Sequence, residues 1–326
     1  MTAETRSYDY ECVDTACVLC GCGTSGFFAK GGDYEYRTSD RVFTFVQCSA
    51  CGHVYLNPRP SDRTLHLAYP SDYYTLSGRH TTGRSRLIAR FKSLVINRRL
   101  RFFRPLLSGR ASVLEVGCGD GSLLMDLKRR YPGLEISGLD MALPQGAAAR
   151  CSAMGIAVRG VSVEQAELGL ERFDLIIMNQ VIEHVADPVA VMEKLSAALK
   201  PGGYVSIETP NPGGYDRRLF RQSFWGGYYF PRHLHLFGRR DLRYLMERAG
   251  LDVIVQNDLL APIIWIFSVH ALLFHGFGKD DRKNRLAGWV SDRNPALLAV
   301  FTGVDLLARF LGCQTSNQKI IARKIV

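Results

Sequence analysis

The chain has 326 residues, of which 47% are hydrophobic and 22% charged, and a formal net charge of +10. This length can bury one full core together with smaller appendages, and the composition is ordinary for a globular protein. Repetitive, fibrous and disordered classes are excluded, because the sequence contains no internal repeat or low-complexity tract. The first residues lack the apolar core of an export signal. We therefore expect a cytoplasmic protein whose nine cysteines are thiols or metal ligands.

Residues 1–75 are expected to form a small module built around two Cys-x-x-Cys-Gly turns. The turns begin at Cys17 and Cys48, and each offers two thiolates at a spacing that can hold one metal ion. Four thiolates fill a tetrahedral zinc site and leave no position for substrate, so the zinc is expected to be structural. The predicted ligands are Cys17, Cys20, Cys48 and Cys51, with Cys22 and His53 close enough to replace one of them.

A basic segment, residues 76–110, follows the cysteine module. Residues 79–110 hold ten Arg or Lys and no acid, which accounts for the whole net charge. Leu87, Phe91 and Leu94 recur at helical spacing and predict an amphipathic helix. This basic face could be simply solvated, or it could meet an anionic membrane, a nucleotide diphosphate on the substrate, or RNA.

The run from Leu114 to Leu123 predicts a cofactor-binding turn between a buried strand and a helix over residues 122–130. Its glycines are spaced Gly-x-Gly-x-Gly, whereas a dinucleotide fingerprint would need a third glycine where Ser122 stands. Glu115 would repel a pyrophosphate but can reach the ammonium group of a methionine. Asp140 ends the next strand, at the distance from the glycines where a carboxylate meets ribose hydroxyls. These features favour S-adenosylmethionine.

The turn and Asp140 resemble the first motifs of class I S-adenosylmethionine-dependent methyltransferases. Later segments follow in the family's order, with strand four at residues 173–177 and the loop before strand five at residues 199–203. The resemblance implies an α/β, Rossmann-like, seven-stranded sheet, in which strand seven, residues 319–323, pairs antiparallel. The acid that often follows strand three to bind adenine is missing, so the adenine contact stays open. The implied cofactor residues are Glu115, Gly117, Cys118, Gly119, Gly121, Asp140, Asn179 and Gln180.

Candidate acceptor-side residues lie after strand four and in the segment from Phe230 to Phe237. Ligands of open α/β sheets lie beyond the carboxyl ends of the strands, which selects Glu183 and His184. The second segment resembles the Pro-x-His-Leu motif of the same family, and His233 corresponds to its histidine. A hydroxyl or carbon acceptor must lose a proton, so we predict His233 as general base. His184 and Glu183 are the other candidates, while His184 could equally fix its turn, and Arg232 could hold an acceptor phosphate or carboxylate.

The expected domains are the cysteine module, the basic linker, a core over residues 111–260, an apolar helical cap over 261–317, and the last strand over 318–326. The cap contains a 20-residue uncharged run from Leu259 to Gly278, long enough to cross a bilayer. A span between two strands of one sheet would put them on opposite sides of the membrane, so we expect a cap instead. The cap could dip into the inner face of the membrane.

Three functions remain open. The N-terminal module, with its Asn-Pro-Arg-Pro turn and tyrosines at positions 73 and 74, resembles that of bacterial sugar methyltransferases. This favours methyl transfer to oxygen or carbon of a nucleotide-linked or lipid-linked sugar. A small or quinone-like acceptor is an alternative within the enzyme class. An RNA methyltransferase or RNA-binding protein is another, although the basic segment has few aromatics and a nucleic-acid partner is not expected. A non-catalytic partner disagrees with the intact cofactor residues.

Overall fold

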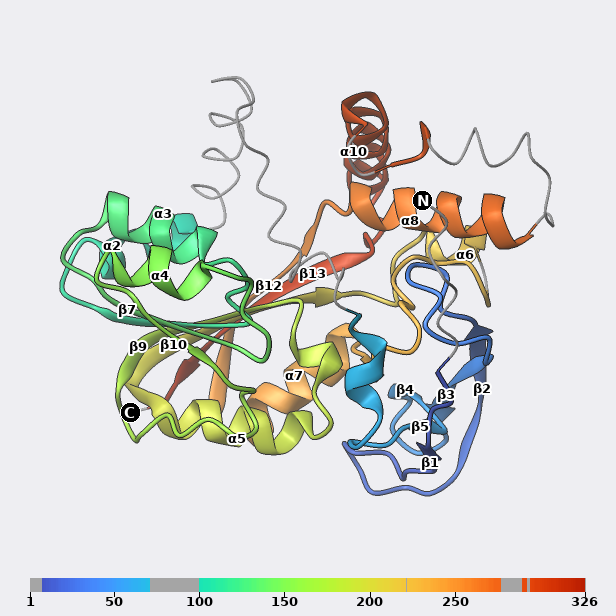
Figure 1. Cartoon of the computed structure of the whole chain (residues 1–326), viewed down its shortest axis with the longest axis horizontal. Helices are drawn as coiled ribbons and strands as arrows, with labels where there is room; N and C mark the ends of the chain where they lie inside the picture. Colours follow the sequence, from blue (N-terminus) through green and yellow to red (C-terminus); the bar gives the residue numbers. More distant parts are fainter. Residues whose placement is uncertain (1–7, 71–99, 221, 277–288, 292–293, 326) are drawn as a thin grey trace.

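The computed structural model describes residues 8–70, 100–220, 222–276, 289–291 and 294–325. Within these residues, a large sheet flanked by helices lies beside a smaller N-terminal sheet and a pair of apolar helices (Figure 1). Most of the predicted basic helix lies outside the described residues, as do Tyr73 and Tyr74. The described end of the basic segment forms two short turns, η2 (Arg101–Phe103) and α2 (Arg104–Leu107).

The central sheet has seven strands in the order β12-β13-β10-β9-β6-β7-β8, which confirms the expected seven-stranded fold. The last strand pairs antiparallel with both of its neighbours, whereas β10, β9, β6, β7 and β8 run parallel. The strands are β6 (Ser112–Val116), β7 (Glu135–Asp140), β8 (Ala157–Gly160), β9 (Phe173–Asn179), β10 (Leu199–Pro210), β12 (Leu251–Leu259) and β13 (Asn317–Lys324).

Helices cover both faces of this sheet, which is why every residue of β6 is buried. In Figure 1, α2, α3 and α4 lie on one face, and α5 and α7 on the other. Each face has its own buried apolar cluster. The helices are α3 (Ser122–Arg130), α4 (Ala147–Ser152), α5 (Pro188–Ala198) and α7 (Arg239–Arg248).

One strand begins earlier than the sequence predicts. The stretch from Leu199 to Gly203 was expected to be the loop before strand five, but β10 already includes it. The pairing with β9 shifts register between Leu199 and Tyr204, and Gly202 there has a φ of 75°. A left-handed glycine lets the strand make this irregular turn without ending.

The smaller sheet joins the N-terminal module to a late segment of the chain. Its order is β11-β4-β3-β2, and β11 (His235–Leu236) comes from the segment predicted to lie at the acceptor. The other strands are β2 (Ser25–Gly31), β3 (Phe43–Cys48) and β4 (Val54–Leu56), followed by the short helix η1 (Leu65–Ala68). A separate two-stranded pair joins β1 (Cys12–Val13) to β5 (Arg59–Pro60).

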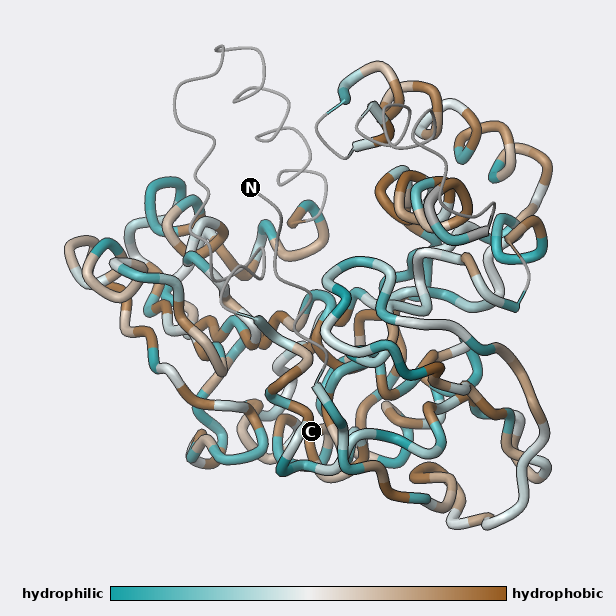
Figure 2. Tube along the Cα trace, turned by 45° about the vertical axis from the view of Figure 1, so that its right-hand side comes forward, coloured by the Kyte–Doolittle hydropathy of each residue, from teal (hydrophilic) through white to brown (hydrophobic). Residues whose placement is uncertain are grey.

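Two helices fill most of the described insert between β12 and β13, as the predicted cap requires. They are α8 (Pro262–Ala271), which continues into η4 (Leu272–Gly276), and α10 (Pro295–Phe310). The buried Asp305 carboxylate of α10 accepts hydrogen bonds from the backbone of Ala261 and the indole of Trp265, which fixes the helices to each other. Figure 2 shows the apolar character of both. Among the described residues, no helix has the length and hydropathy needed to cross a membrane.

Candidate functional site

The glycine-rich turn follows β6 and leaves an open space at its centre. Gly117, Gly119 and Gly121 all have positive φ, a conformation that other residues rarely adopt. A Cβ at Gly117 would lie 2.2 Å from Val181, and one at Gly121 would lie 2.3 Å from the Cys151 sulfur. At Gly119 a Cβ would meet no atom of the described residues within 4 Å, so this glycine faces the open side of the turn. The open side is where a cofactor can approach the backbone.

Asp140, at the end of β7, holds this turn in place. One carboxylate oxygen accepts a hydrogen bond from the Gly119 amide at 2.7 Å, and the other accepts from the Ala142 amide at 2.9 Å. Burial raises the pKa of Asp140, and both amide hydrogen bonds oppose that rise. Glu115 is also buried, with 5% of its surface exposed, next to Gly138 on β7. Two carboxyl groups thus flank the turn, where the ribose and ammonium groups of the cofactor are expected.

The other predicted cofactor residues are Cys118, Asn179 and Gln180, and their side chains have different surroundings. The Cys118 side chain is buried in the core near Gly138, so its sulfur does not face the open side of the turn. Asn179 is the last residue of β9. The backbone amide of Gln180 donates to the Glu208 carbonyl, and the Gln180 side chain donates to the side chain of Asn317, the first residue of β13. Gln180 has a φ of 55°, a strained conformation at the carboxyl end of a strand. We expect Cys118 to shape the turn and Asn179 to be nearer the cofactor.

Glu183 lies in the short helix η3 (Ile182–His184), which follows β9 directly. Its side chain is fully buried, and one oxygen accepts a hydrogen bond from the Thr209 hydroxyl at 2.9 Å. The other oxygen, Oε1, has no hydrogen-bond partner among the described residues and lies 4.0 Å from Nε2 of His233. The Glu183 carbonyl accepts from the Leu234 amide, which ties η3 to the segment carrying His233. Glu183 and His233, 50 positions apart in the chain, are therefore brought together.

Both neighbouring histidines have a defined tautomer, because each Nδ1 lies against a backbone carbonyl that can only accept. Nδ1 of His184 is 3.0 Å from the Arg232 carbonyl, and Nδ1 of His233 is 2.9 Å from the Gly227 carbonyl. Each Nδ1 therefore carries the proton when the ring is neutral, leaving Nε2 with its lone pair. The two rings are 4.7 Å apart and nearly perpendicular. The free lone pair of His233 faces Glu183.

Burial sets the protonation of this cluster. It raises the pKa of Glu183 to about 8, lowers the pKa of His184 to about 4, and lowers the pKa of His233 well below its ordinary value. The histidines are therefore neutral at pH 7, as a general base must be. The potential ligand atoms of Glu183, His184 and His233 lie within 4.8 Å of one another. Oε1 of Glu183 and Nε2 of His233 are 4.0 Å apart, whereas direct ligation of one zinc ion by both would place them about 3.4 Å apart, so this separation leaves room for an acceptor oxygen.

A family model described as a methyltransferase domain matches residues 88–256, more than half of the chain. The chain belongs to this methyltransferase family. It is a class I S-adenosylmethionine-dependent methyltransferase, in agreement with the expected enzyme class and methyl donor.

Curated relatives of the methyltransferase include two described as ubiquinone biosynthesis O-methyltransferase. The protein from Cereibacter sphaeroides strain KD131 is 29% identical over 170 residues, covering 49% of this chain and 68% of the relative. The protein from Methylobacterium nodulans is 34% identical over 163 residues, covering 46% of this chain and 64% of the relative. The similarity to these relatives therefore covers less than half of this chain.

Solved structures with a similar fold include two methyltransferases. One is the 1,6-didemethyltoxoflavin-N1-methyltransferase of Burkholderia thailandensis with bound S-adenosylhomocysteine, at 14% identity and a TM-score of 0.49, covering 85% of this chain and 98% of that one. The other is an S-adenosylmethionine-dependent methyltransferase of Archaeoglobus fulgidus, at 22% identity and a TM-score of 0.47, covering 78% of this chain and 100% of that one.

Arg232 of the methyltransferase does not have the role that the sequence suggested. It was expected to hold a phosphate or carboxylate of the acceptor, but its side chain is fully buried and pairs with Asp33 of the N-terminal module. Both terminal nitrogens donate to the Asp33 carboxylate at 2.9 Å. A guanidinium already paired with a buried carboxylate is not available to an acceptor group. No sequence motif links positions 33 and 232, so this pair could not be predicted from the sequence.

A tyrosine of the N-terminal module reaches the acceptor-side cluster. Tyr73 and Tyr74 were the predicted participants and lie outside the described residues. Tyr69 instead places its hydroxyl 3.0 Å from Nδ1 of His184, and the Tyr229 ring packs 5.1 Å from the His233 ring. The module therefore contributes directly to the surroundings of the candidate base.

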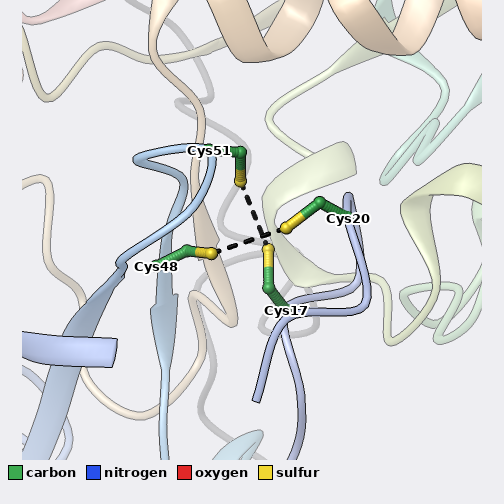
Figure 3. A group of neighbouring side chains, drawn as sticks. All are labelled: Cys17, Cys20, Cys48 and Cys51. Atoms are coloured by element: carbon green, nitrogen blue, oxygen red, sulfur yellow. Dashed lines mark hydrogen bonds between the residues drawn. The ribbon is translucent and has the colours of Figure 1, made fainter. Parts of the chain in front are cut away.

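The four predicted zinc ligands of the methyltransferase point toward one another (Figure 3). The sulfurs of Cys17 and Cys51 are 3.6 Å apart, those of Cys20 and Cys48 are 3.5 Å apart, and all four lie within 4.8 Å. A zinc–sulfur distance of about 2.3 Å corresponds to sulfurs roughly 3.8 Å apart in a tetrahedron. The donor set therefore fits a closed zinc site.

Cys22 and His53, the two alternative ligands, make other contacts. The Cys22 sulfur lies 3.2 Å from the Thr24 hydroxyl. His53 has Nδ1 3.2 Å from Asp241 and Nε2 3.1 Å from Nδ1 of His235, so both ring nitrogens are occupied. His53 and His235 therefore connect the two parts of the protein, and His235 does not join His233 in a His-x-His metal site.

Proposed function

We propose that this enzyme transfers the methyl group of S-adenosylmethionine to a hydroxyl oxygen of a small, quinone-like acceptor, with His233 as general base. The curated relatives support this acceptor class, since they are described as ubiquinone biosynthesis O-methyltransferases. The proposal replaces the sugar acceptor favoured by the N-terminal segment, for which these relatives offer no support. No relative named above supports the RNA alternative.

One observation carries the proposal: the lone pair on Nε2 of His233 and the unpartnered Oε1 of Glu183 face each other across 4.0 Å. An acceptor hydroxyl placed there donates its hydrogen to Nε2. As the oxygen attacks the methyl carbon, the carbon–sulfur bond breaks, sulfur keeps the electron pair, and the proton moves to His233. Glu183, when ionised, stabilises the imidazolium that forms.

The remaining groups of the cluster position this base. The Gly227 carbonyl fixes the tautomer of His233, and Thr209 orients Glu183 by donating to its other oxygen. The cluster lies after the carboxyl end of β9, where ligands of open α/β sheets bind. Burial excludes water from the base, so a bound acceptor is favoured over bulk water as the proton donor.

Two measurements test this function. Calorimetric titration of S-adenosylhomocysteine should give micromolar binding that is lost in Asp140→Ala, because Asp140 holds the glycine turn. Methyl transfer from radiolabelled donor should then be compared among a short-chain prenylated catechol, a nucleotide sugar and an RNA. Transfer to the catechol alone supports the proposal. Transfer only to the sugar or to RNA contradicts the acceptor class while leaving the methyltransferase intact.

We also propose that Cys17, Cys20, Cys48 and Cys51 hold one structural zinc ion. The sulfur spacing and the two Cys-x-x-Cys-Gly turns support this. Gly21 and Gly52 follow the turns with φ of 74° and 81°, and the amides of Gly21 and Gly52 donate to the carbonyls of Cys17 and Cys48. Such closed turns hold the sulfurs in place. The zinc would stabilise the module and take no part in methyl transfer.

We further propose that the outer face of α10 rests on an anionic bilayer surface. Leu307 and Phe310 on this helix are 60% and 86% exposed, and Leu311 just after it is 67% exposed. The helix has one acid, Asp305, which is buried, and one base, Arg309, which is exposed. This combination suits acidic lipid headgroups over an apolar interior, where a quinone-like acceptor would dissolve.

Vesicle sedimentation tests the membrane proposal. Binding to phosphatidylglycerol vesicles should exceed binding to phosphatidylcholine vesicles, and Phe310→Ser with Leu311→Ser should weaken both. Vesicle binding that does not depend on Phe310 and Leu311 would contradict the proposal. A dimer that depends on these residues, as measured by light scattering, would also contradict it, because the face would then contact a second copy of the chain.

A further inference from the structure

The segment that carries His233 is built into the sheet of the N-terminal module. β11 pairs antiparallel with β4, with His235 opposite Tyr55 and Leu236 opposite Val54. The Leu56 amide also donates to the Leu234 carbonyl at 2.8 Å. The residue directly after His233 is therefore hydrogen-bonded to the module. The candidate base is thus attached to the module through this strand pairing.

The Asp33 carboxylate of the N-terminal module accepts several hydrogen bonds, two of them from Arg232. Besides both terminal nitrogens of Arg232, it accepts from the Tyr36 amide at 3.1 Å and from the amide and hydroxyl of Thr38 at 2.9 and 2.6 Å. The Asp33 and Arg232 side chains are both fully buried. Removing one partner of such a pair leaves a buried charge uncompensated, which is strongly unfavourable.

Arg232 connects Asp33 to both histidines. Its guanidinium lies over the rings of both Tyr36 and Tyr229, at 4.4 and 5.0 Å from their centres. Its backbone carbonyl accepts from Nδ1 of His184, and His233 is the next residue. The amides of Arg232 and His233 both donate to the Tyr229 carbonyl. The backbone of Arg232 thus contacts His184 and precedes His233, while its side chain binds Asp33.

We propose that Asp33 is a positioning residue for methyl transfer: by binding and neutralising Arg232, it holds His233 in place and prevents an unbalanced positive charge from acting on it. The inference rests on the proposed function, because it assumes that His233 accepts the proton. It extends that function to the N-terminal module, whose contribution is this carboxylate. The module is thereby part of the acceptor side of the enzyme.

The charges around the two histidines support this assignment. His233 faces Glu183, His184, Arg232 and Tyr229, while His184 also faces Arg232 and Tyr69. Arg232 faces Asp33, Glu35, Tyr36 and Tyr229. The positive charge of Arg232 lowers the pKa of both histidines in addition to the larger effect of burial. Without Asp33, that effect grows and His233 becomes a weaker base.

Asp33→Asn in the full-length protein tests the inference, because the amide keeps the size of the side chain and loses its charge. We expect kcat to fall about tenfold or more, as a weakened general base predicts. The KM for S-adenosylmethionine and the affinity for S-adenosylhomocysteine should stay unchanged, since Asp33 does not contact the glycine turn. The limb of the pH–rate profile that reports His233 should move to lower pH.

Asp62→Asn is the matched control, because this exposed aspartate of the same module forms an ion pair with Arg59 at the surface and lies outside the cluster. A second variant, Asp33→Asn with Arg232→Met, removes the unbalanced charge and should recover part of kcat and return the pH limb. Unchanged kcat and pH profile in Asp33→Asn would overturn the inference. So would a loss of kcat that occurs without a pH shift and is not recovered in the double variant, since Asp33 would then serve only folding.

His233→Ala separates this inference from the proposed function. If His233→Ala retains full turnover, the proposed base is wrong and Asp33 has no base to position. If His233→Ala is inactive while Asp33→Asn matches the control, only the role of Asp33 is refuted.

Discussion

Two clusters within the described part of the chain have the donor atoms of metal sites, and they differ in spacing. In the cysteine cluster, sulfurs 3.5 and 3.6 Å apart come from two tight turns. In the acceptor-side cluster, Glu183 and His233 are 4.0 Å apart, and the histidines are fixed by backbone carbonyls. The first spacing fits a bound ion, and the second leaves room for an oxygen that gives up a proton. Spacing, more than residue type, distinguishes metal binding from proton transfer here.

The largest effect should follow from His233→Ala. Turnover should fall roughly a hundredfold or more, because the proton acceptor is lost, while S-adenosylhomocysteine binding measured by calorimetry stays the same. His66→Ala, an exposed histidine of the N-terminal module, is the control. Loss of bound zinc in His233→Ala would contradict the distinction between the clusters.

Removing the metal should affect stability first. Metal analysis should find one zinc per chain, and Cys48→Ser should lose it and lower Tm by roughly 10 °C or more, because a structural zinc contributes directly to folding. We expect kcat to fall as well, through β4 and β11, with cofactor affinity retained. Cys313→Ser, an exposed cysteine, is the control. A Cys48→Ser protein of unchanged Tm would show that the sulfurs do not hold a structural ion.

Glu183→Gln should change the pH dependence of the reaction. Burial raises the pKa of Glu183 to about 8, so the carboxyl is mostly neutral at pH 7 and ionises as the pH rises through 8. Its negative charge then stabilises the imidazolium, and kcat should increase through this range. The Gln variant should lose that limb and about tenfold in kcat at high pH, with zinc content unchanged. Glu193→Gln is the control and should keep the limb near pH 8. If the limb also persists in Glu183→Gln, it reports the titration of another group.

The smallest effect is expected from Thr209→Val, which removes the donor to Glu183. The hydrogen bond from Thr209 lowers the pKa of Glu183, so its loss should move the limb to higher pH and cost a few-fold in kcat at pH 8. A shift toward lower pH would contradict the proposed hydrogen bond.

Local signals in the sequence were enough for the sheet and the cysteine cluster. The glycine turn, the strand after it and Asp140 are contiguous or follow a family spacing, and the structure places all three at one end of β6 and β7. The same holds for the cysteines, because each Cys-x-x-Cys turn brings its own two sulfurs together. What the sequence misjudged is Arg232, whose charge suggested an acceptor group.

The sequence by itself determined the seven-stranded sheet and the enzyme class, because its glycine turn and later segments resemble a known family in residue type and order. Short-range spacing also determined that each pair of cysteines shares one turn. Only the tertiary structure decided how the acceptor side is assembled. Asp33 and Arg232 are 199 residues apart, and His53 and His235 are 182 apart. Such pairs form because folding buries charged and polar groups that must then find partners, and no local pattern records which partner is met.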